Sequence, residues 1–245
     1  DRGIGEGTGY GDSQLAVSGT KSFAVAAWTR LTTDPGVAAG ATMTAAQQAE
    51  MMNSTDVMAA VYDGTIWTTT LLSDSSATAP DLAPAVAAAN GKAIVAWRSV
   101  ASTNLEESLT RFDAEDSILY RTYENGQWSE VKTLYNGTSG AVKGLEAAIM
   151  DEGTAALVYT IDTHDRPIAA DGVQTYTQSG QSAQDNTGLE VVYAIVDDLT
   201  GRGNETDDLT AANVRLTYDD QLDENPQITT AEIGGEAHFI IAWSR

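Results

Sequence analysis

Three arginines stand out because each follows a tryptophan closely and the chain has only 13 Lys and Arg residues. A guanidinium group offers two parallel hydrogen-bond donors, which suits it to binding an anionic or polar ligand. One arginine comes directly after its tryptophan and the other two come one residue later, so alternation along a strand predicts that they point to opposite sides. The alternative is that each pairs with a nearby acid. The candidate ligand-binding residues are Arg30, Arg98 and Arg245.

A second candidate is an acidic run over residues 197–208. Its Asp, Asn, Glu and Thr side chains carry the oxygen ligands that Ca²⁺ prefers. The run lacks the ordered ligand spacing of an EF-hand, and a solvated acidic loop is the alternative interpretation. The candidate metal ligands are Asp197, Asp198, Asp207 and Asp208.

The sequence has few other residues or motifs that could catalyse a reaction or bind a metal. The chain has no Cys and 2 His, which excludes cysteine nucleophiles and thiolate metal sites. No zinc-protease, P-loop or nucleophile-elbow motif occurs in a suitable context. We assign no catalytic residue, and Ca²⁺ is the one cofactor that the sequence suggests.

The arginines belong to an internal repeat. Each copy has a short apolar strand, a turn with Gly, and a second apolar strand that ends in an aromatic residue. Asn-Gly and Gly-Gly between apolar runs are strong hairpin signals, because the tight turn needs positive φ. The second strands are apolar on both faces, so we expect them to be covered on both sides. The copies span residues 14–30, 84–98, 145–159 and 226–245.

A second hairpin follows each of the first three copies, at 57–67, 118–129 and 189–218. Four strands in two hairpins make up a propeller blade. We therefore predict an all-β fold of propeller-like four-stranded blades, about three and a half repeats long. A two-sheet β-sandwich array is the alternative.

Polar or small-residue insertions separate the two hairpins of each complete repeat. They cover residues 31–55, 100–115 and 163–187, and they should emerge on one face of the fold. Strong helix formers over 37–53 predict a short helix in the first insertion. Long loops on a rigid scaffold often carry function, and surface drift is the alternative.

Two short motifs carry a family resemblance. Tyr123-Glu124-Asn125-Gly126-Gln127-Trp128-Ser129 resembles the degenerate Asp-box hairpin of sialidase-like propellers, and so does the segment 62–67. The resemblance implies ligand sites on the face that bears the insertions. It also implies an enzyme that holds a substrate carboxylate with three arginines and uses a Tyr nucleophile, a Glu and an Asp. No spacing picks out that catalytic set, and the Arg-Ile-Pro signature of the family is absent.

The bulk composition restricts the partners. A net charge of −22 excludes nucleic acid and anionic membrane surfaces, and leaves room for divalent cations. The absence of Cys favours a bacterial extracellular or cell-surface protein over a eukaryotic secreted one. The chain lacks an initial Met, so we expect a segment of a larger protein.

We expect one propeller-type domain over residues 1–245, with repeats near 12–73, 79–137, 142–219 and 224–245. Closed propellers need about 4 to 8 blades, so the remaining blades should come from the parent chain or a second copy.

These observations favour a non-catalytic binding or scaffold module whose ligand is a glycan or a protein. A sialidase-like glycoside hydrolase and a purely structural repeat segment are the alternatives. A deep pocket with paired carboxylates would favour the hydrolase.

Overall fold

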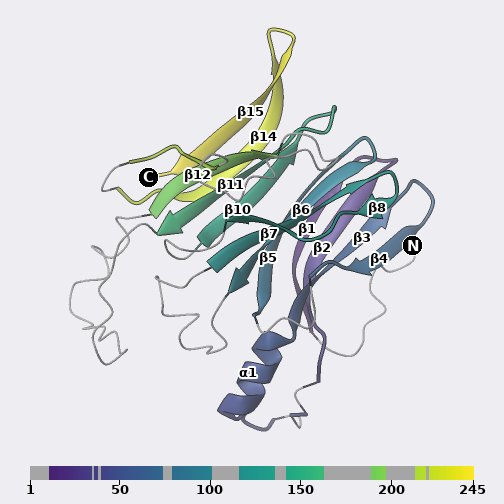
Figure 1. The fold of residues 1–245 in the computed structure, drawn as a ribbon, viewed down its shortest axis with the longest axis vertical. Coiled ribbons are helices and arrows are strands. Elements are labelled where there is room, and N and C mark those ends of the chain that lie inside the picture. Colours follow the sequence, from purple (N-terminus) through teal and green to yellow (C-terminus); the bar gives the residue numbers. More distant parts are fainter. Residues whose placement is uncertain are drawn as a thin grey trace.

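The computed structural model describes residues 11–34, 36–37, 40–73, 79–100, 116–135, 142–162, 189–196, 213–218 and 221–245. These residues form antiparallel sheets with one helix, which confirms the all-β class (Figure 1).

Blade 1 is a four-stranded meander in which each strand pairs with the next. Its strands are β1 (Asp12–Gly19), β2 (Ala24–Leu31), β3 (Thr55–Tyr62) and β4 (Trp67–Leu71). The helix α1 (Ala45–Asn53) lies in the connection between β2 and β3.

Blade 2 repeats the meander with an interrupted outer strand. Its strands are β5 (Asp81–Ala89), β6 (Lys92–Val100), β7 (Asp116–Glu124), β8 (Gln127–Trp128) and β9 (Lys132–Tyr135). Both β8 and β9 pair with β7. The break falls at Ser129, whose backbone N–H donates to the carbonyl of Thr122 and whose side chain accepts from the Thr122 N–H.

Blade 3 contains β10 (Val142–Ile149), β11 (Ala155–Asp162), β12 (Leu189–Val196) and β13 (Asn213–Arg215). The C-terminal hairpin, β14 (Glu224–Ile233) with β15 (Glu236–Ser244), holds the first two strands of a further repeat. About three and a half repeats were predicted, and the described sheets confirm this number.

The sheets stack face to face along their first strands. β1 lies against β5, β5 against β10, and β10 against β14. One apolar core fills the space between blades 1 and 2, and another fills the space between blades 2 and 3. Trp97 and Tyr159, the repeat aromatics of blades 2 and 3, are fully buried in these cores. The second strands of blades 1, 2 and 3 are covered on both faces as predicted, and Ala93 to Trp97 are all inaccessible to solvent. The second strand of the C-terminal hairpin, β15, differs from the prediction because most of its residues are exposed or half-buried.

The hairpin turns follow from their sequences. Asn90 and Gly91 have φ of 49° and 80°, and Asn125 and Gly126 have φ of 53° and 82°. A two-residue turn with positive φ at both positions matches the right-handed twist of the flanking strands, and Asn-Gly adopts it at low cost.

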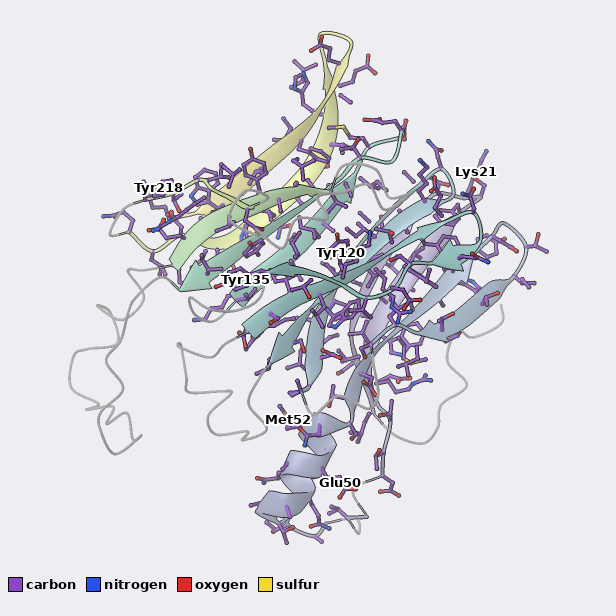
Figure 2. All side chains as sticks on the ribbon, viewed as in Figure 1. Lys21, Glu50, Met52, Tyr120, Tyr135 and Tyr218 are labelled. Atoms are coloured by element: carbon purple, nitrogen blue, oxygen red, sulfur yellow. The ribbon has the colours of Figure 1, made fainter. Side chains whose placement is uncertain are left out.

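The helix is shorter than the predicted span of 37–53. Thr44 caps its N-terminus in a capping box with Gln47, in which each side chain bonds the backbone N–H of the other residue. Gly40 has φ of +81°, which is incompatible with a right-handed helix at that residue. Met52 of this helix is buried, whereas Glu50 is exposed (Figure 2).

Candidate functional site

All of the blades present equivalent strand ends on one side, which we call the loop end. First strands begin there, second strands end there and third strands begin there, as the strand register shows. The connections between second and third strands therefore emerge at the loop end, and Figure 1 shows α1 extending from it. Most of the buried charged residues lie at this end of the sheets.

A β-bulge marks the loop end of every first strand. The register shifts in β1, β5, β10 and β14, each time beside a residue with φ near +50°. These residues are Gln14, Ala83, Gly144 and Asn225. Each bulge sets the pairing between the first and second strands on its loop-end side. It therefore determines which residue of the second strand lies opposite the residue two positions before Gln14, Ala83, Gly144 or Asn225.

In blade 1 this alignment places Asp12 opposite Arg30. The Arg30 Nε donates to Asp12 Oδ1 at 2.7 Å and its Nη2 donates to Oδ2 at 3.0 Å. Hydrogen bonding from Arg30 holds the pKa of Asp12 below its ordinary value, although partial burial opposes this. The Arg30 side chain is only 9 % exposed. Its two hydrogen bonds to Asp12 connect β2 to β1 and stabilise the pairing of these strands.

The C-terminal hairpin repeats the arrangement with Asp223 and Arg245. The Arg245 Nε donates to Asp223 Oδ1 at 3.0 Å and its Nη2 donates to Oδ2 at 3.3 Å. The indole N–H of Trp243 also donates to Asp223 Oδ1, at 3.0 Å. Burial would raise the pKa of Asp223, but hydrogen bonds from Arg245 and Thr217 outweigh it and lower that pKa.

The third arginine lies on the other face of its strand, as alternation predicted. Arg98 Nε lies 2.7 Å from Asp116 Oδ2 on the neighbouring strand β7. Asp116 is fully buried and also accepts from the backbone N–H of Val142, the first residue of blade 3. Burial raises the pKa of Asp116 and the charge of Arg98 opposes the rise. This acid therefore links blade 2 to blade 3.

Blade 2 lacks an arginine at the repeated position, so its acid has different partners. Asp81 faces Ser99 in the register and is 2 % exposed. Burial raises its pKa to about 6, hydrogen bonds from Ser99 and Ser73 oppose the rise, and the charge of Asp56 adds to it. Asp56 is also buried, and it accepts from the hydroxyls of Ser73 and Thr32.

Blade 3 has an acid–arginine pair between its outer strands. The Arg215 Nη2 lies 2.6 Å from Glu190 Oε1, and Glu190 is 1 % exposed. The Arg215 guanidinium also stacks over the ring of Tyr218 at 4.6 Å from its centroid. Tyr218 is 72 % exposed, and Figure 2 shows it at the periphery of the molecule.

The structure thus places the three predicted arginines at the loop end of their blades, each in an ion pair with an acid. Direct contact of Arg30, Arg98 and Arg245 with a ligand stays a prediction. The sequence argument missed Asp12 and Asp223, although a signal was present. Asp81 and Asp223 stand three residues before Pro84 and Pro226, the residues from which two of the repeats were aligned.

The predicted Ca²⁺ ligands Asp197, Asp198, Asp207 and Asp208 lie outside the described residues, so that site stays a prediction. Within the described part of the chain, no group of three or more His, Asp and Glu side chains is placed to hold a metal ion. The helix that the structure describes is too short and too polar to cross a membrane.

No protein-family model and no curated protein matches the sequence. The solved structures that are similar to this chain include the following three. The haemagglutinin-neuraminidase of parainfluenza virus 5 is 10 % identical with a TM-score of 0.49, covering 93 % of this chain and 54 % of that chain. An α-L-arabinofuranosidase from Fusarium graminearum is 12 % identical with a TM-score of 0.45, covering 90 % and 53 %. Trypanosoma rangeli sialidase is 13 % identical with a TM-score of 0.45, covering 93 % and 33 %.

This chain therefore spans between a third and about half of the length of these proteins. Similarity at this level carries no inference about reaction or ligand. The fold assignment rests on the four-stranded sheets and on the stacking of their first strands.

Proposed function

We propose that this chain is a non-catalytic binding or scaffold module whose ligand is a glycan or a protein. The observation that carries the proposal is the commitment of the three loop-end arginines to acids of their own blades, at 2.7 to 3.0 Å. Arg30 and Arg245 each form a two-pronged bond to an internal carboxylate, so their best donors are occupied, and Arg98 is held by one contact to the buried Asp116. Such pairs hold strand ends in position, as a scaffold for the connecting segments requires.

The loop end has features of a contact surface. Tyr218 is largely exposed and is held in place by Arg215, and Trp243 is 39 % exposed and held by Asp223. Aromatic side chains that are fixed by polar neighbours supply contact area at a low entropic cost. These residues support ligand binding at this end of the sheets.

The proposed setting is extracellular or on a bacterial cell surface, as part of a larger assembly. The net charge of −22 and the absence of Cys support this setting. In the assembly, additional blades come from the parent chain or from a second copy. Leu15 and Val17 of β1 support this, because they are 69 % and 64 % exposed, whereas the first strand of blade 2 is largely covered.

The test measures binding and turnover on the same samples. The chain is incubated with a panel of neutral, uronic-acid and sialic-acid oligosaccharides, binding is followed by titration calorimetry, and released sugar is measured by chromatography. We expect binding, or no response, without sugar release. Release that scales with protein concentration would overturn the proposal in favour of the glycoside hydrolase.

A further inference from the structure

Two of the four hairpins hold a positive charge on the acid at their loop end. In blade 1 the two carboxylate oxygens of Asp12 accept from the guanidinium of Arg30. In the C-terminal hairpin the two oxygens of Asp223 accept from Arg245 in the same way. Asp223 Oδ1 also accepts from the indole N–H of Trp243. The acid at this repeated position therefore binds a cation beside the repeat tryptophan.

Blade 2 keeps the acid of this position without the arginine. Its hairpin pairs Asp81 with Ser99, whereas blade 3 pairs Val142 with Ile161 and lacks both charged residues. Asp81 is 2 % exposed, and its Oδ1 atom is buried and accepts no hydrogen bond. In the described part of the chain no Lys or Arg pairs with Asp81. A buried carboxylate without a counter-charge is strongly unfavourable, so this position requires a cation from another source or a proton.

A second buried acid, Asp56 of β3, adds negative charge at the same place. Asp56 is 2 % exposed, and its charge raises the pKa of Asp81. Both carboxylates hydrogen-bond Ser73, whose hydroxyl lies 3.0 Å from Asp56 Oδ1. The Ser73 hydroxyl has one hydrogen and already accepts from the backbone N–H of Val57, so it donates to only one acid at a time. Blades 1 and 2 therefore bring together two carboxylates that compete for one donor.

The nearest arginines are bonded elsewhere. Arg30 lies opposite Asp56 in the register of β2 and β3, but its guanidinium bonds both oxygens of Asp12. Arg98 lies on the other face of β6 and pairs with Asp116. Among the residues that the structure describes, the partners of Asp56 and Asp81 are thus neutral groups, which leaves the negative charge of the pair uncompensated.

We propose that a divalent cation such as Ca²⁺ binds between Asp56 and Asp81, in place of the arginine that blade 2 lacks. Carboxylate and hydroxyl oxygens are the ligands that Ca²⁺ prefers, and backbone oxygens and water complete its shell of about 6 to 8. The ion links β3 of blade 1 to β5 of blade 2. In chelating buffer, where no such ion is present, protonation of Asp81 is the alternative that lowers the charge. This site is separate from the acidic run 197–208 and independent of the ligand-binding role proposed above.

Terbium luminescence tests the site, because Tb³⁺ binds at Ca²⁺ sites and emits when a nearby tryptophan is excited. The indole of Trp97 lies beside Asp81 and serves as the sensitiser. At pH 7.5 we expect the wild type to show sensitised emission that Ca²⁺ displaces, with a Ca²⁺ dissociation constant of about 10⁻⁴–10⁻³ M, as in extracellular modules. Asp81→Asn and Asp56→Asn should each raise the dissociation constants for Tb³⁺ and Ca²⁺ at least tenfold.

Ser99→Arg places a guanidinium opposite Asp81, as Arg30 lies opposite Asp12, and it should abolish the sensitised emission. Asp12→Asn is the matched control, because Asp12 holds the same register position in blade 1 but is bonded to Arg30. It should bind Tb³⁺ like the wild type. Calcium should also raise the urea midpoint of the wild type and of Asp12→Asn, but not that of Ser99→Arg.

Two results would overturn the proposal. The first is a wild type that shows no sensitised emission and no calcium-dependent shift of its urea midpoint. The second is binding that Asp81→Asn, Asp56→Asn and Ser99→Arg all leave unchanged, since the cation would then lie elsewhere, for example on the acidic run 197–208. Circular dichroism of each variant shows that a lost signal does not come from a lost fold, and three separate substitutions keep the test decisive if one of them unfolds.

Discussion

Asp81 lies opposite Ser99 in blade 2, at the register position where Asp12 lies opposite Arg30 in blade 1. The C-terminal hairpin keeps the arginine at this position, with Arg245 bonded to Asp223. Blade 2 therefore buries the repeated carboxylate without the arginine that neutralises it elsewhere. Its surroundings are hydroxyl groups and a second buried acid, Asp56.

This difference predicts that the protein becomes more stable as pH falls from 8 to 5. The pKa of Asp81 rises from an ordinary 3.8 to about 6 because the side chain is buried. Between these two values the folded chain binds a proton that the unfolded chain has released, so the free energy of unfolding increases toward the lower pH. At about 1.4 kcal/mol per pKa unit, the gain is on the order of 1 kcal/mol by pH 5, and it reaches about 3 kcal/mol only when the pH falls below 3.8.

Urea unfolding at pH 5, 6, 7 and 8 measures the effect, with Asp81→Asn as the comparison. The Asn variant removes the Asp81 carboxyl, so its stability should rise less than that of the wild type over this range, whereas the raised pKa of Asp116 contributes equally to both proteins. The lowered pKa values of Asp12 and Asp223 contribute only at more acidic pH, below this window. Parallel pH profiles for the wild type and Asp81→Asn would contradict the assignment.

Introducing the arginine that blade 2 lacks should stabilise the protein more at pH 8 than at pH 5. Ser99→Arg places a guanidinium opposite Asp81, in the register that Arg30 occupies opposite Asp12. We expect it to raise stability at pH 8 by about 1–3 kcal/mol, as a charge-assisted hydrogen bond to a buried carboxylate does. The gain should shrink at pH 5, where Asp81 is protonated. Ser99→Met has a similar length without the charge, and an equal gain from it would show that packing is responsible.

Variants of Arg30 and Asp12 test whether this ion pair stabilises the fold. If Arg30 braces the strands, Arg30→Gln should lower the free energy of unfolding by about 1–3 kcal/mol. Asp12→Asn should have a similar effect, and the double variant should cost less than the sum of the two single variants because the pair is lost once. Chemical unfolding of the four proteins measures this coupling. Additive costs would mean that the 2.7 Å contact contributes nothing to stability.

Sequence reasoning predicted the local features of this fold well. Asn90-Gly91 predicts its turn because few dipeptides adopt positive φ twice, and the apolar run from Ala93 to Trp97 predicts burial on both faces. Both signals lie within a few adjacent residues. The repeated Asp was visible in the sequence, but its pairing with an arginine could not be predicted, for a physical reason. Asp12 faces Arg30 only because the bulge beside Gln14 shifts the register, and no composition rule signals a bulge at Gln.

The helix shows the same limit. Propensity predicted the span 37–53, because Ala, Met and Gln favour helices, but the helix begins after Thr44. The capping box between Thr44 and Gln47 was visible in the sequence, and it was the better predictor of the start. Averaged propensity fails at helix ends because the first-turn N–H groups need specific acceptors.

The contact between blade 3 and the C-terminal hairpin can be tested at Gly144. A Cβ there would lie 2.8 Å from Pro226 Cδ, closer than packed carbon atoms approach, and Gly144 has φ of +58°. The positive φ alone is tolerated, since Ala83 adopts +51° at the equivalent bulge of blade 2. The Gly144→Ala variant should therefore lose about 1–3 kcal/mol from overpacking, in addition to a backbone term of about 1 kcal/mol.

Gly91→Ala isolates the backbone term, because Gly91 has φ of +80° and a Cβ there would meet no atom within 4 Å. It should cost only about 1–2 kcal/mol. Thermal and urea unfolding of both variants give the comparison. If the hairpin packs on blade 3 through Pro226, Pro226→Ala should recover part of the Gly144→Ala loss by removing the ring that the new methyl group meets. Equal costs for Gly144→Ala and Gly91→Ala, with no recovery in the double variant, would show that the hairpin does not pack there.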